Sequence, residues 1–137
     1  MLTRWIGRIS YEDALAEQER IVAELAQGEG SQETLLLLEH HSVFTIGRTP
    51  DQSSLREHGR LPHPVHVINR GGQATYHGPG QLVGYPLLDL RRRGQDLHKY
   101  LRSVEEFVVR GCRALGVNAS RRVRRRAADW AQMLRPR

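Results

Sequence analysis

The pattern of apolar positions predicts a strand and then a helix at the start of the chain. Residues 2–9 alternate loosely between apolar and polar side chains, as a half-buried strand does. Ser10 can cap a helix, and Asp13 stands three residues later, in the position of the capping-box acid. The helix carries one apolar stripe, which consists of Leu15, Ile21, Val22, Leu25 and Ala26. Gly28 and Gly30 are expected to end it.

Further apolar runs predict strands at residues 34–39, 43–46, 65–68 and 82–90. The first is a leucine run, a composition that a buried helix can share, whereas the second is β-branched and aromatic. Pro86 lacks a backbone donor, so the last strand is expected at a sheet edge or at a bulge. The polar segment 47–64 is rich in proline and is predicted to be an exposed loop.

The clearest helix is expected over residues 96–115. Its apolar side chains keep helical spacing over about five turns. They are Leu97, Tyr100, Leu101, Val104, Phe107, Val108, Cys112 and Leu115. Gly116 takes the position of a left-handed cap, and Val117 is expected to begin another strand. The order of elements predicts an α/β fold of the α+β kind, a mixed sheet with flanking helices.

Length and composition bound the kind of protein. The 137 residues suffice for one domain with a real core. No apolar run of about 18 residues exists, and the first residues lack the layout of a signal peptide. Cys112 is the only cysteine, which excludes an internal disulfide and gives no spacing for a metal cluster. We therefore expect a cytoplasmic protein without a transmembrane helix.

The net charge of +6 is concentrated in the last residues. Residues 121–137 hold seven arginines and one aspartate, so residues 1–120 sum to zero. We expect a domain over residues 1–120 and an arginine-rich tail, 121–137, outside it. The tail is a nucleic-acid or anion-binding arm, an inert disordered end, or the product of an out-of-frame translation. The abrupt change of pattern favours the last, and the neutral body makes nucleic-acid binding the weakest function class.

Residues 70–81, the glycine segment, concentrate the candidate chemistry. Glycine lets a backbone turn sharply and approach a ligand closely. The polar side chains suit a carbonyl or amide, and they are Thr75, Tyr76, His77 and Gln81. The segment lacks the ending of a phosphate-binding loop and the spacing of a dinucleotide fingerprint. The structural alternative is that residues 78–80 form only a tight hairpin turn and that His77 only holds the loop by hydrogen bonds.

The sequence from Arg70 to Tyr85, RGGQATYHGPGQLVGY, resembles the signature of the lipoyl (octanoyl) transferase family. The sequence from Leu38 to Arg48, LEHHSVFTIGR, resembles an earlier segment of the same family. The resemblance covers about residues 1–120 and implies a biotin/lipoate ligase-like catalytic module. Biotin and lipoate ligases share this fold but carry a different ending where this chain has residues 78–81.

The resemblance implies acyl transfer without a metal, nucleotide or other cofactor. In this family, octanoate arrives as a thioester on acyl carrier protein, and an enzyme cysteine takes it. A lysine on a lipoyl domain of a 2-oxoacid dehydrogenase, or on the glycine cleavage H protein, then removes it. A thiolate with a nearby ammonium suits such thioester exchange. The substrate-binding residues that carry over are Arg70, Gly71, Gly72, Gln73, Ala74, Thr75, Tyr76 and His77.

The catalytic lysine and cysteine of this family have no counterpart here, because both follow the position that corresponds to Ser120. Lys99 is the only lysine and lies off the apolar stripe of its helix, as a solvated lysine does. Cys112 continues that stripe, as a small core residue does. We therefore expect no catalytic residue in this chain, a catalytically incomplete transferase that lacks the C-terminal part. The alternatives are a ligase-like acyl-binding protein and a non-catalytic module with a basic anion-binding tail.

Several other residues allow two interpretations, and others are expected to have only a structural role. His40 and His41 face the same pocket, or His40 merely ends a strand. Residues 91–93 are three arginines that form a solvated turn or contact the acidic surface of an acyl carrier protein. Trp5 and Tyr85 are expected in the core. The remaining histidines near prolines show no metal-ligand spacing, and they are His58, His63 and His66.

Overall fold

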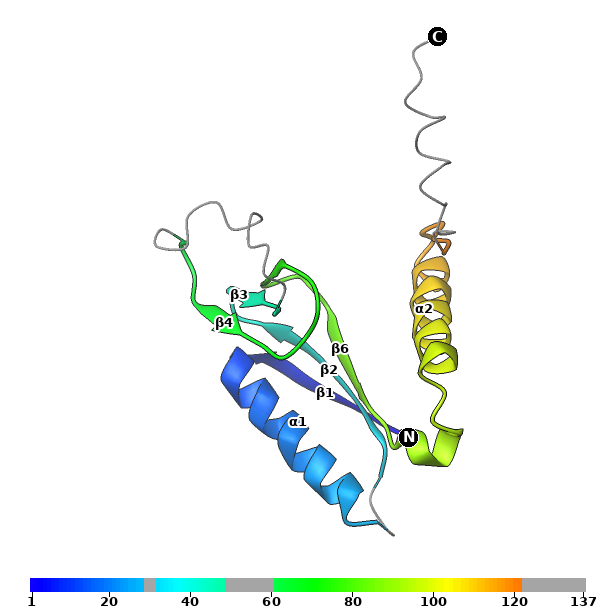
Figure 1. Cartoon of the computed structure of the whole chain (residues 1–137). Helices are drawn as coiled ribbons and strands as arrows, with labels where there is room; N and C mark the ends of the chain where they lie inside the picture. The colour runs from blue at the N-terminus through cyan, green and yellow to red at the C-terminus, as the bar shows by residue number, and fades with distance from the viewer. Residues whose placement is uncertain (29–31, 49–60, 122–137) are drawn as a thin grey trace. The chain divides into compact units, whose positions relative to one another are not determined.

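The computed structural model describes residues 1–28, 32–48 and 61–121, which form two compact units (Figure 1). The first unit is Met1–Asp89, and the second begins at Leu90. Most of the predicted loop 47–64, Gly30, His58 and all of the predicted tail except Arg121 lie outside the described residues. None of the helices in the described part is long and apolar enough to cross a membrane.

The larger apolar elements of the first unit build a three-stranded sheet with the order β1–β2–β6 (Figure 1). Strand β1 (Leu2–Ile9) runs parallel to β2 (Thr34–His40), and β6 (Val83–Leu87) runs antiparallel to β2. The leucine run is therefore the central strand, in which leucines on both faces are buried. Strand β6 lies at an edge, as Pro86 predicted.

Helix α1 (Tyr11–Ala26) packs on this sheet. The Ser10 hydroxyl accepts the Asp13 N–H at 3.1 Å and donates to the Asp13 carboxylate at 2.6 Å, so the predicted cap is confirmed. The predicted stripe is only partly correct. The buried residues are Ala14, Ile21 and Leu25, whereas Leu15 and Val22 are exposed. Ala14, Ile21 and Leu25 recur at intervals of seven and four, so they share one face, and Leu15 and Val22 lie one residue, about 100°, further round the helix.

The core of the first unit combines Ile21 and Leu25 of α1 with Leu36 of β2, and Tyr85 packs against it as expected. Trp5, in contrast, is 60% exposed, so its predicted place in the core is wrong. It lies on β1, an edge strand, beside a register shift at Gly7, where the ordinary alternation of inward and outward side chains is interrupted.

A second three-stranded sheet has the order β4–β3–β5. Strand β3 (Val43–Ile46) runs parallel to β4 (Val65–Val67) and antiparallel to β5 (Ala74–His77). The α+β class with mixed sheets is confirmed, but the expected single sheet is divided into two. Strand β5 lies inside the glycine segment, where only a loop was expected, because its four residues are too few to show a pattern between glycines.

The second unit contains the 3₁₀-helix η2 (Leu90–Arg93) and helix α2 (Leu97–Ala114). The Asp96 carboxylate caps α2 by accepting the Lys99 N–H at 2.9 Å. At the other end, the N–H groups of Gly116 and Val117 bond back to Arg113 and Cys112, at 3.0 and 2.9 Å. This is a Schellman cap with Gly116 at φ +78°, as predicted. Val117 is in no strand, because its N–H belongs to the cap.

The apolar stripe of α2 is less buried than predicted. Val109 is buried, whereas Cys112, which was expected as a small core residue, is only partly buried. The exposed apolar side chains of this helix are Leu97, Leu101, Phe107 and Val108. Lys99 is exposed, as predicted.

Candidate functional site

The glycine segment begins directly against the end of β3. A Cβ on Gly47 would overlap the carbonyl oxygen of Gly72 and would lie 2.9 Å from those of Arg70 and Gly71. The Arg48 N–H donates to the Arg70 carbonyl at 2.9 Å, which holds the two stretches together. Only glycine at position 47 permits this approach, so the backbone of residues 70–72 is placed by close packing as well as by hydrogen bonds.

Arg70 directs its guanidinium back into the protein. It donates to the carbonyl of Thr45 at 3.2 Å, to the Thr45 hydroxyl at 3.1 Å and to the Thr75 hydroxyl at 2.9 Å. A further bond of 2.9 Å reaches the carbonyl of Gly71. Arg70 therefore ties the glycine segment to β3, a positioning role that the sequence did not indicate.

His77 lies at the end of a chain of hydrogen bonds that starts at Arg70. Its Nδ1 is 2.9 Å from Oε1 of Gln81, and its Nε2 is 3.4 Å from the hydroxyl of Thr45. Because an amide oxygen only accepts, Nδ1 carries the proton and Nε2 accepts from Thr45. Thr45 is 1% exposed and in turn accepts from Arg70. These contacts fix the tautomer of the imidazole.

His40, the last residue of β2, lies beneath His77. The two rings are 5.7 Å apart in an edge-to-face arrangement. His40 is 0% exposed, and its Nε2 is 2.8 Å from the hydroxyl of Tyr85. Its Nδ1 has no hydrogen-bond partner in the described part of the chain. His40 thus ends a strand and also faces the candidate site, whereas His41 is exposed.

Burial controls the protonation of His40 and Tyr85, which lie beneath His77. Desolvation lowers the pKa of His40, and the nearby His77 acts in the same direction, while the carbonyls of Ile9 and Ser10 oppose them. Burial also raises the pKa of Tyr85 to about 12. The imidazole of His40 and the phenol of Tyr85 are therefore both neutral at pH 7.

Tyr76 is on the opposite face of β5 from Thr75 and His77, because side chains alternate along a strand. Its hydroxyl is 3.0 Å from that of Ser42, and its ring packs 5.2 Å from the ring of Phe44. A Cβ on Gly78 would meet the Tyr76 ring at 2.8 Å. The predicted substrate-binding residues are thus divided between two faces.

Residues 78–81 form a tight turn, closed by the Gln81 N–H and the Gly78 carbonyl at 3.1 Å. The turn does not make a hairpin, because β5 and β6 belong to different sheets. It carries the chain from one sheet to the other, and this brings His77 of the second sheet to His40 of the first. The alternative that residues 78–80 form a tight hairpin turn is therefore correct about the turn and wrong about the hairpin.

Glu39 anchors that turn, and the sequence did not single it out. Its carboxylate accepts from the Gly80 N–H and from Arg8, both at 3.1 Å. The bond from Gly80 is the main cause that lowers the pKa of Glu39, so the carboxylate is ionised at pH 7. A glutamate at the exposed side of a strand, immediately before two histidines, is too common a pattern to reveal such a role.

His63 and His66 contact tyrosine rings. His66 stacks on Tyr11 at 5.1 Å, and His63 lies 5.9 Å from the ring of Tyr76. Within residues 1–28, 32–48 and 61–121, no group of three or more histidines, cysteines or acids is placed to hold a metal ion. Lys99 and Cys112 belong to the second unit.

Comparison with known proteins identifies relatives over most of the chain. Residues 10–127 match the family description "Lipoyl protein ligase A/B catalytic domain". An octanoyltransferase of Citrifermentans bemidjiense is 53% identical over 117 residues, which are 85% of this chain and 55% of that protein. One of Geobacter metallireducens is 48% identical over 132 residues, 95% of this chain and 59% of that protein. The chain spans about half the length of the curated relatives it matches.

Proposed function

The chain belongs to the lipoyl protein ligase A/B catalytic-domain family, and from this premise we propose that it supplies the acyl-binding part of an octanoyltransferase. Such an acyltransferase of lipoate biosynthesis moves an octanoyl group from acyl carrier protein to a lysine of a lipoyl domain. The observation that carries the proposal is the glycine segment, clamped against β3 by Arg70 and Gly47. The names of the relatives support the octanoyl group as the cargo.

We assign different tasks to the predicted substrate-binding residues. Thr75 and His77 lie on one face of β5, Arg70 donates to the Thr75 hydroxyl, and the backbone of Gly71 and Gly72 packs against Gly47 at the end of β3. We propose that this face receives the thioester carbonyl, where preorganised donors stabilise developing negative charge. Tyr76 packs on the other face and supports the strand.

We propose that the buried pair beneath His77, His40 and Tyr85, supports its ring as uncharged groups. A neutral His40 packs edge to face under the imidazole and brings no second charge next to it. The Thr45 hydroxyl bonds to Nε2 of His77 and holds its ring in one orientation. A thioester is already activated, so no nucleotide enters this scheme.

We propose that this chain binds substrate without forming a covalent intermediate. Residues 1–137 contain a single cysteine and a single lysine. Cys112 continues the apolar side of α2, and Lys99 stands on its exposed side. We propose that neither acts as the nucleophile and that this chain alone forms no acyl-enzyme. Incubation with octanoyl-acyl carrier protein, followed by intact mass spectrometry, tests this. A stable octanoyl thioester that disappears in Cys112→Ser would overturn it.

A ligase-like function is the second candidate, because the matching family includes lipoyl protein ligases. A ligase activates free octanoate or lipoate with ATP, whereas a transferase needs only the thioester. ATP-dependent pyrophosphate release from free octanoate would therefore favour the ligase. A nucleic-acid module, the third candidate, would bind in a steeply salt-dependent way that is lost when residues 121–137 are removed.

A further inference from the structure

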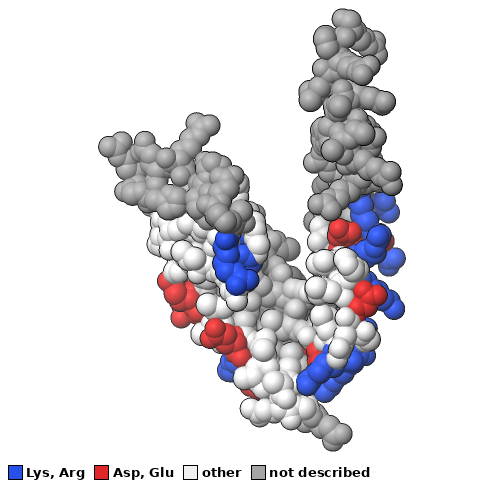
Figure 2. Space-filling model, in the orientation of Figure 1, with Lys and Arg blue, Asp and Glu red and all other residues white. Residues whose placement is uncertain are grey.

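The near-neutral sum of residues 1–120 conceals two opposite charges. Residues 1–89 hold seven arginines and eleven acids, a net charge of −4. Residues 90–121 hold eight lysines and arginines and three acids, a net charge of +5. The basic character therefore begins at η2, well before the predicted tail, and the described surface of the second unit carries more basic than acidic groups (Figure 2).

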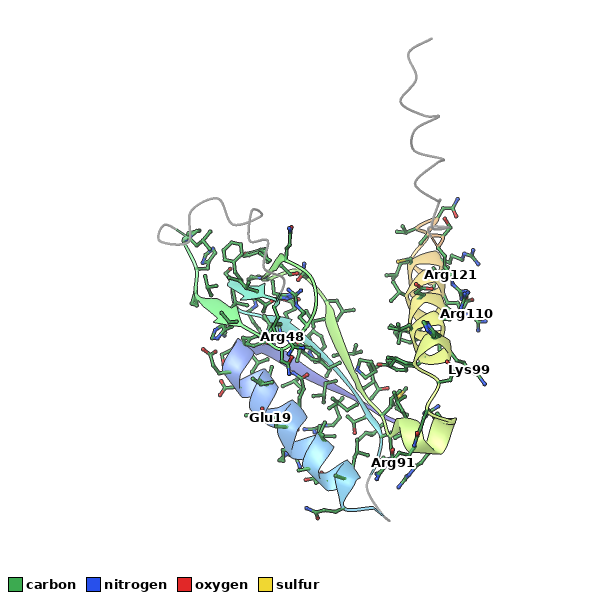
Figure 3. The ribbon with its side chains drawn as sticks, viewed as in Figure 1. Glu19, Arg48, Arg91, Lys99, Arg110 and Arg121 are labelled. Atoms are coloured by element: carbon green, nitrogen blue, oxygen red, sulfur yellow. The ribbon has the colours of Figure 1, made fainter. Side chains whose placement is uncertain are left out.

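The cations of α2 are arranged along one side of the helix. Lys99, Arg102, Arg110 and Arg113 follow one another at intervals of three, eight and three residues, which places them on one face. We call these four residues the basic stripe. It is about 20 Å long, at about 1.5 Å per residue. All four are exposed, and Lys99, Arg110 and the nearby Arg121 project from the same side of α2 (Figure 3).

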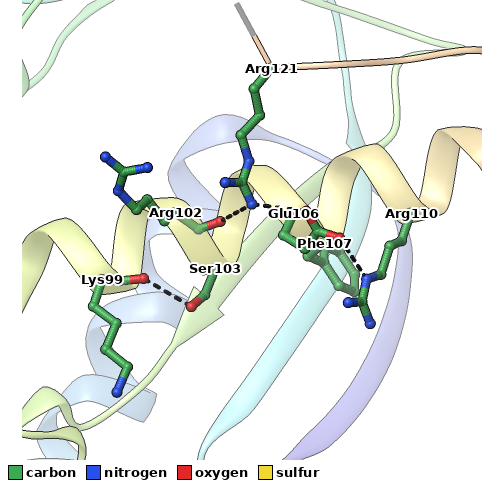
Figure 4. Close-up of a pocket in the computed structure, with 7 residues that line it drawn as sticks. All are labelled: Lys99, Arg102, Ser103, Glu106, Phe107, Arg110 and Arg121. Atoms are coloured by element: carbon green, nitrogen blue, oxygen red, sulfur yellow. Dashed lines mark hydrogen bonds and ion pairs between the residues drawn. The ribbon is translucent and has the colours of Figure 1, made fainter. Parts of the chain in front are cut away.

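The one acid on this face, Glu106, is already neutralised within the unit. Its carboxylate accepts from Arg110 and from Arg121, each at 2.8 Å (Figure 4). The bond from Arg110 is the main cause that lowers the pKa of Glu106. Arg121 also reaches the carbonyl of Arg102 at 3.4 Å, so residue 121 is folded back onto α2.

The other cations of the stripe form no ion pair with an acid in the described part of the chain. Lys99, Arg102 and Arg113 have no acidic partner among the residues that the structure describes. In the first unit, by comparison, Arg4, Arg8 and Arg20 each pair with a glutamate of the same unit. The stripe therefore presents the pair Lys99 and Arg102 at one end and Arg113 at the other, separated by the centre where Glu106 is paired.

A hollow of about 460 Å³ lies on the stripe (Figure 4). Its lining includes the cations Lys99, Arg102, Arg110 and Arg121, together with Ser103, Glu106 and the exposed aromatic ring of Phe107. Exposed aromatic and arginine side chains in a shallow hollow are the residue types that most often anchor protein partners.

We propose that the basic stripe and its hollow dock the acidic carrier protein that delivers the octanoyl thioester. This inference rests on the proposed function. An acidic helix laid along α2 would meet cations at both ends of the stripe, while Phe107 gives it one apolar contact. The neutralised centre fits separate carboxylates on a helix better than the evenly spaced phosphates of a nucleic acid.

Binding of a fluorescently labelled carrier protein to the 137-residue chain tests the inference. Lys99→Gln combined with Arg102→Gln removes two charges from the stripe. The control, Gln27→Glu with Gln32→Glu, changes the net charge equally at exposed positions of the first unit. We expect about tenfold weaker binding for the stripe variant, the low end of electrostatic steering, and unchanged binding for the control. Circular dichroism verifies that both variants remain folded.

The outcomes separate this inference from the proposed function. Equal binding by wild type and stripe variant, or equal weakening in stripe variant and control, overturns the docking surface. Carrier protein without the octanoyl group should still bind through the stripe, whereas the proposed function requires tighter binding when the octanoyl group is attached. Stripe-dependent binding without that preference supports the docking surface and contradicts the proposed function. Binding of duplex DNA in place of the carrier protein overturns the inference.

Discussion

At the candidate site of the first unit, polar side chains are hydrogen-bonded to one another, whereas three cations of the basic stripe on α2 are exposed without an acidic partner in the described part of the chain. Arg70, Thr45 and His77 form one continuous chain of hydrogen bonds, and Glu39 holds the following turn. On α2, Lys99 and Arg102 have no acidic partner in the described part of the chain. Groups that are satisfied internally keep a fixed geometry, which a reacting carbonyl requires. Exposed charges adapt to a partner surface and speed its approach.

The largest expected effect breaks the fixed geometry of the first unit. Gly47→Ala places a Cβ against three carbonyl oxygens, so the start of the glycine segment must move away. We expect a loss of about 3 kcal/mol in the free energy of unfolding, the upper range for overpacking. Gly71→Ala is the control, since a Cβ there meets nothing within 4 Å. Equal stability of the two variants in urea denaturation would contradict the close approach.

The next effect concerns the hydrogen-bond chain itself. Thr45→Val removes the buried hydroxyl between Arg70 and His77 and leaves their groups unsatisfied, at a cost of about 1–2 kcal/mol. The ¹⁵N shifts of His77 should move from the Nδ1–H tautomer toward a mixture. Ser42→Ala, which removes an exposed hydroxyl bonded to Tyr76, should leave those shifts unchanged. An unaltered His77 spectrum in the Thr45 variant would refute the fixed tautomer.

The pH dependence of stability reports on the buried layer. The pKa of His40 is lowered in the folded state, so the unfolded chain binds this proton more readily. The melting temperature should therefore fall as the pH drops below the ordinary histidine pKa of about 6.5. His40→Gln should flatten the decline in that range. The pKa of Glu17 is lowered to about 2, chiefly by the bond from Arg20. Protonation of Glu17 therefore lowers stability only at pH values below its ordinary pKa of 4.5.

The smallest effect tests whether the two units respond separately. Asp96→Ala removes the cap of α2 and should cost about 1 kcal/mol in that helix. Hydrogen exchange should become faster for the first amides of α2, with no change in α1. Ser10→Ala, the matching cap variant of α1, should show the reverse pattern. Acceleration in both helices by either substitution would show that the units unfold together.

Local signals in the sequence were sufficient for most elements. The strand at residues 2–9, the cap at Ser10 and the left-handed Gly116 were all predicted, because each depends on neighbours within a few residues. Strand β5 and the exposure of Trp5 were not predicted. Both depend on which strand lies alongside, and pairing between distant segments leaves little trace in a local pattern. The arginine-rich tail of residues 121–137 stays a prediction.

The glycine segment illustrates the same division at the candidate site. The residue types and the resemblance to the lipoyl (octanoyl) transferase family led to the prediction that residues 70–77 bind the substrate, which stays a prediction. Only the tertiary structure decided that Arg70 faces inward, that Tyr76 lies on the other face of β5 and that His40 supports His77. The sequence determines the chemistry available, because side chains carry it. Their partners depend on sheet pairing and on the turn between the sheets, which bring together residues more than thirty positions apart.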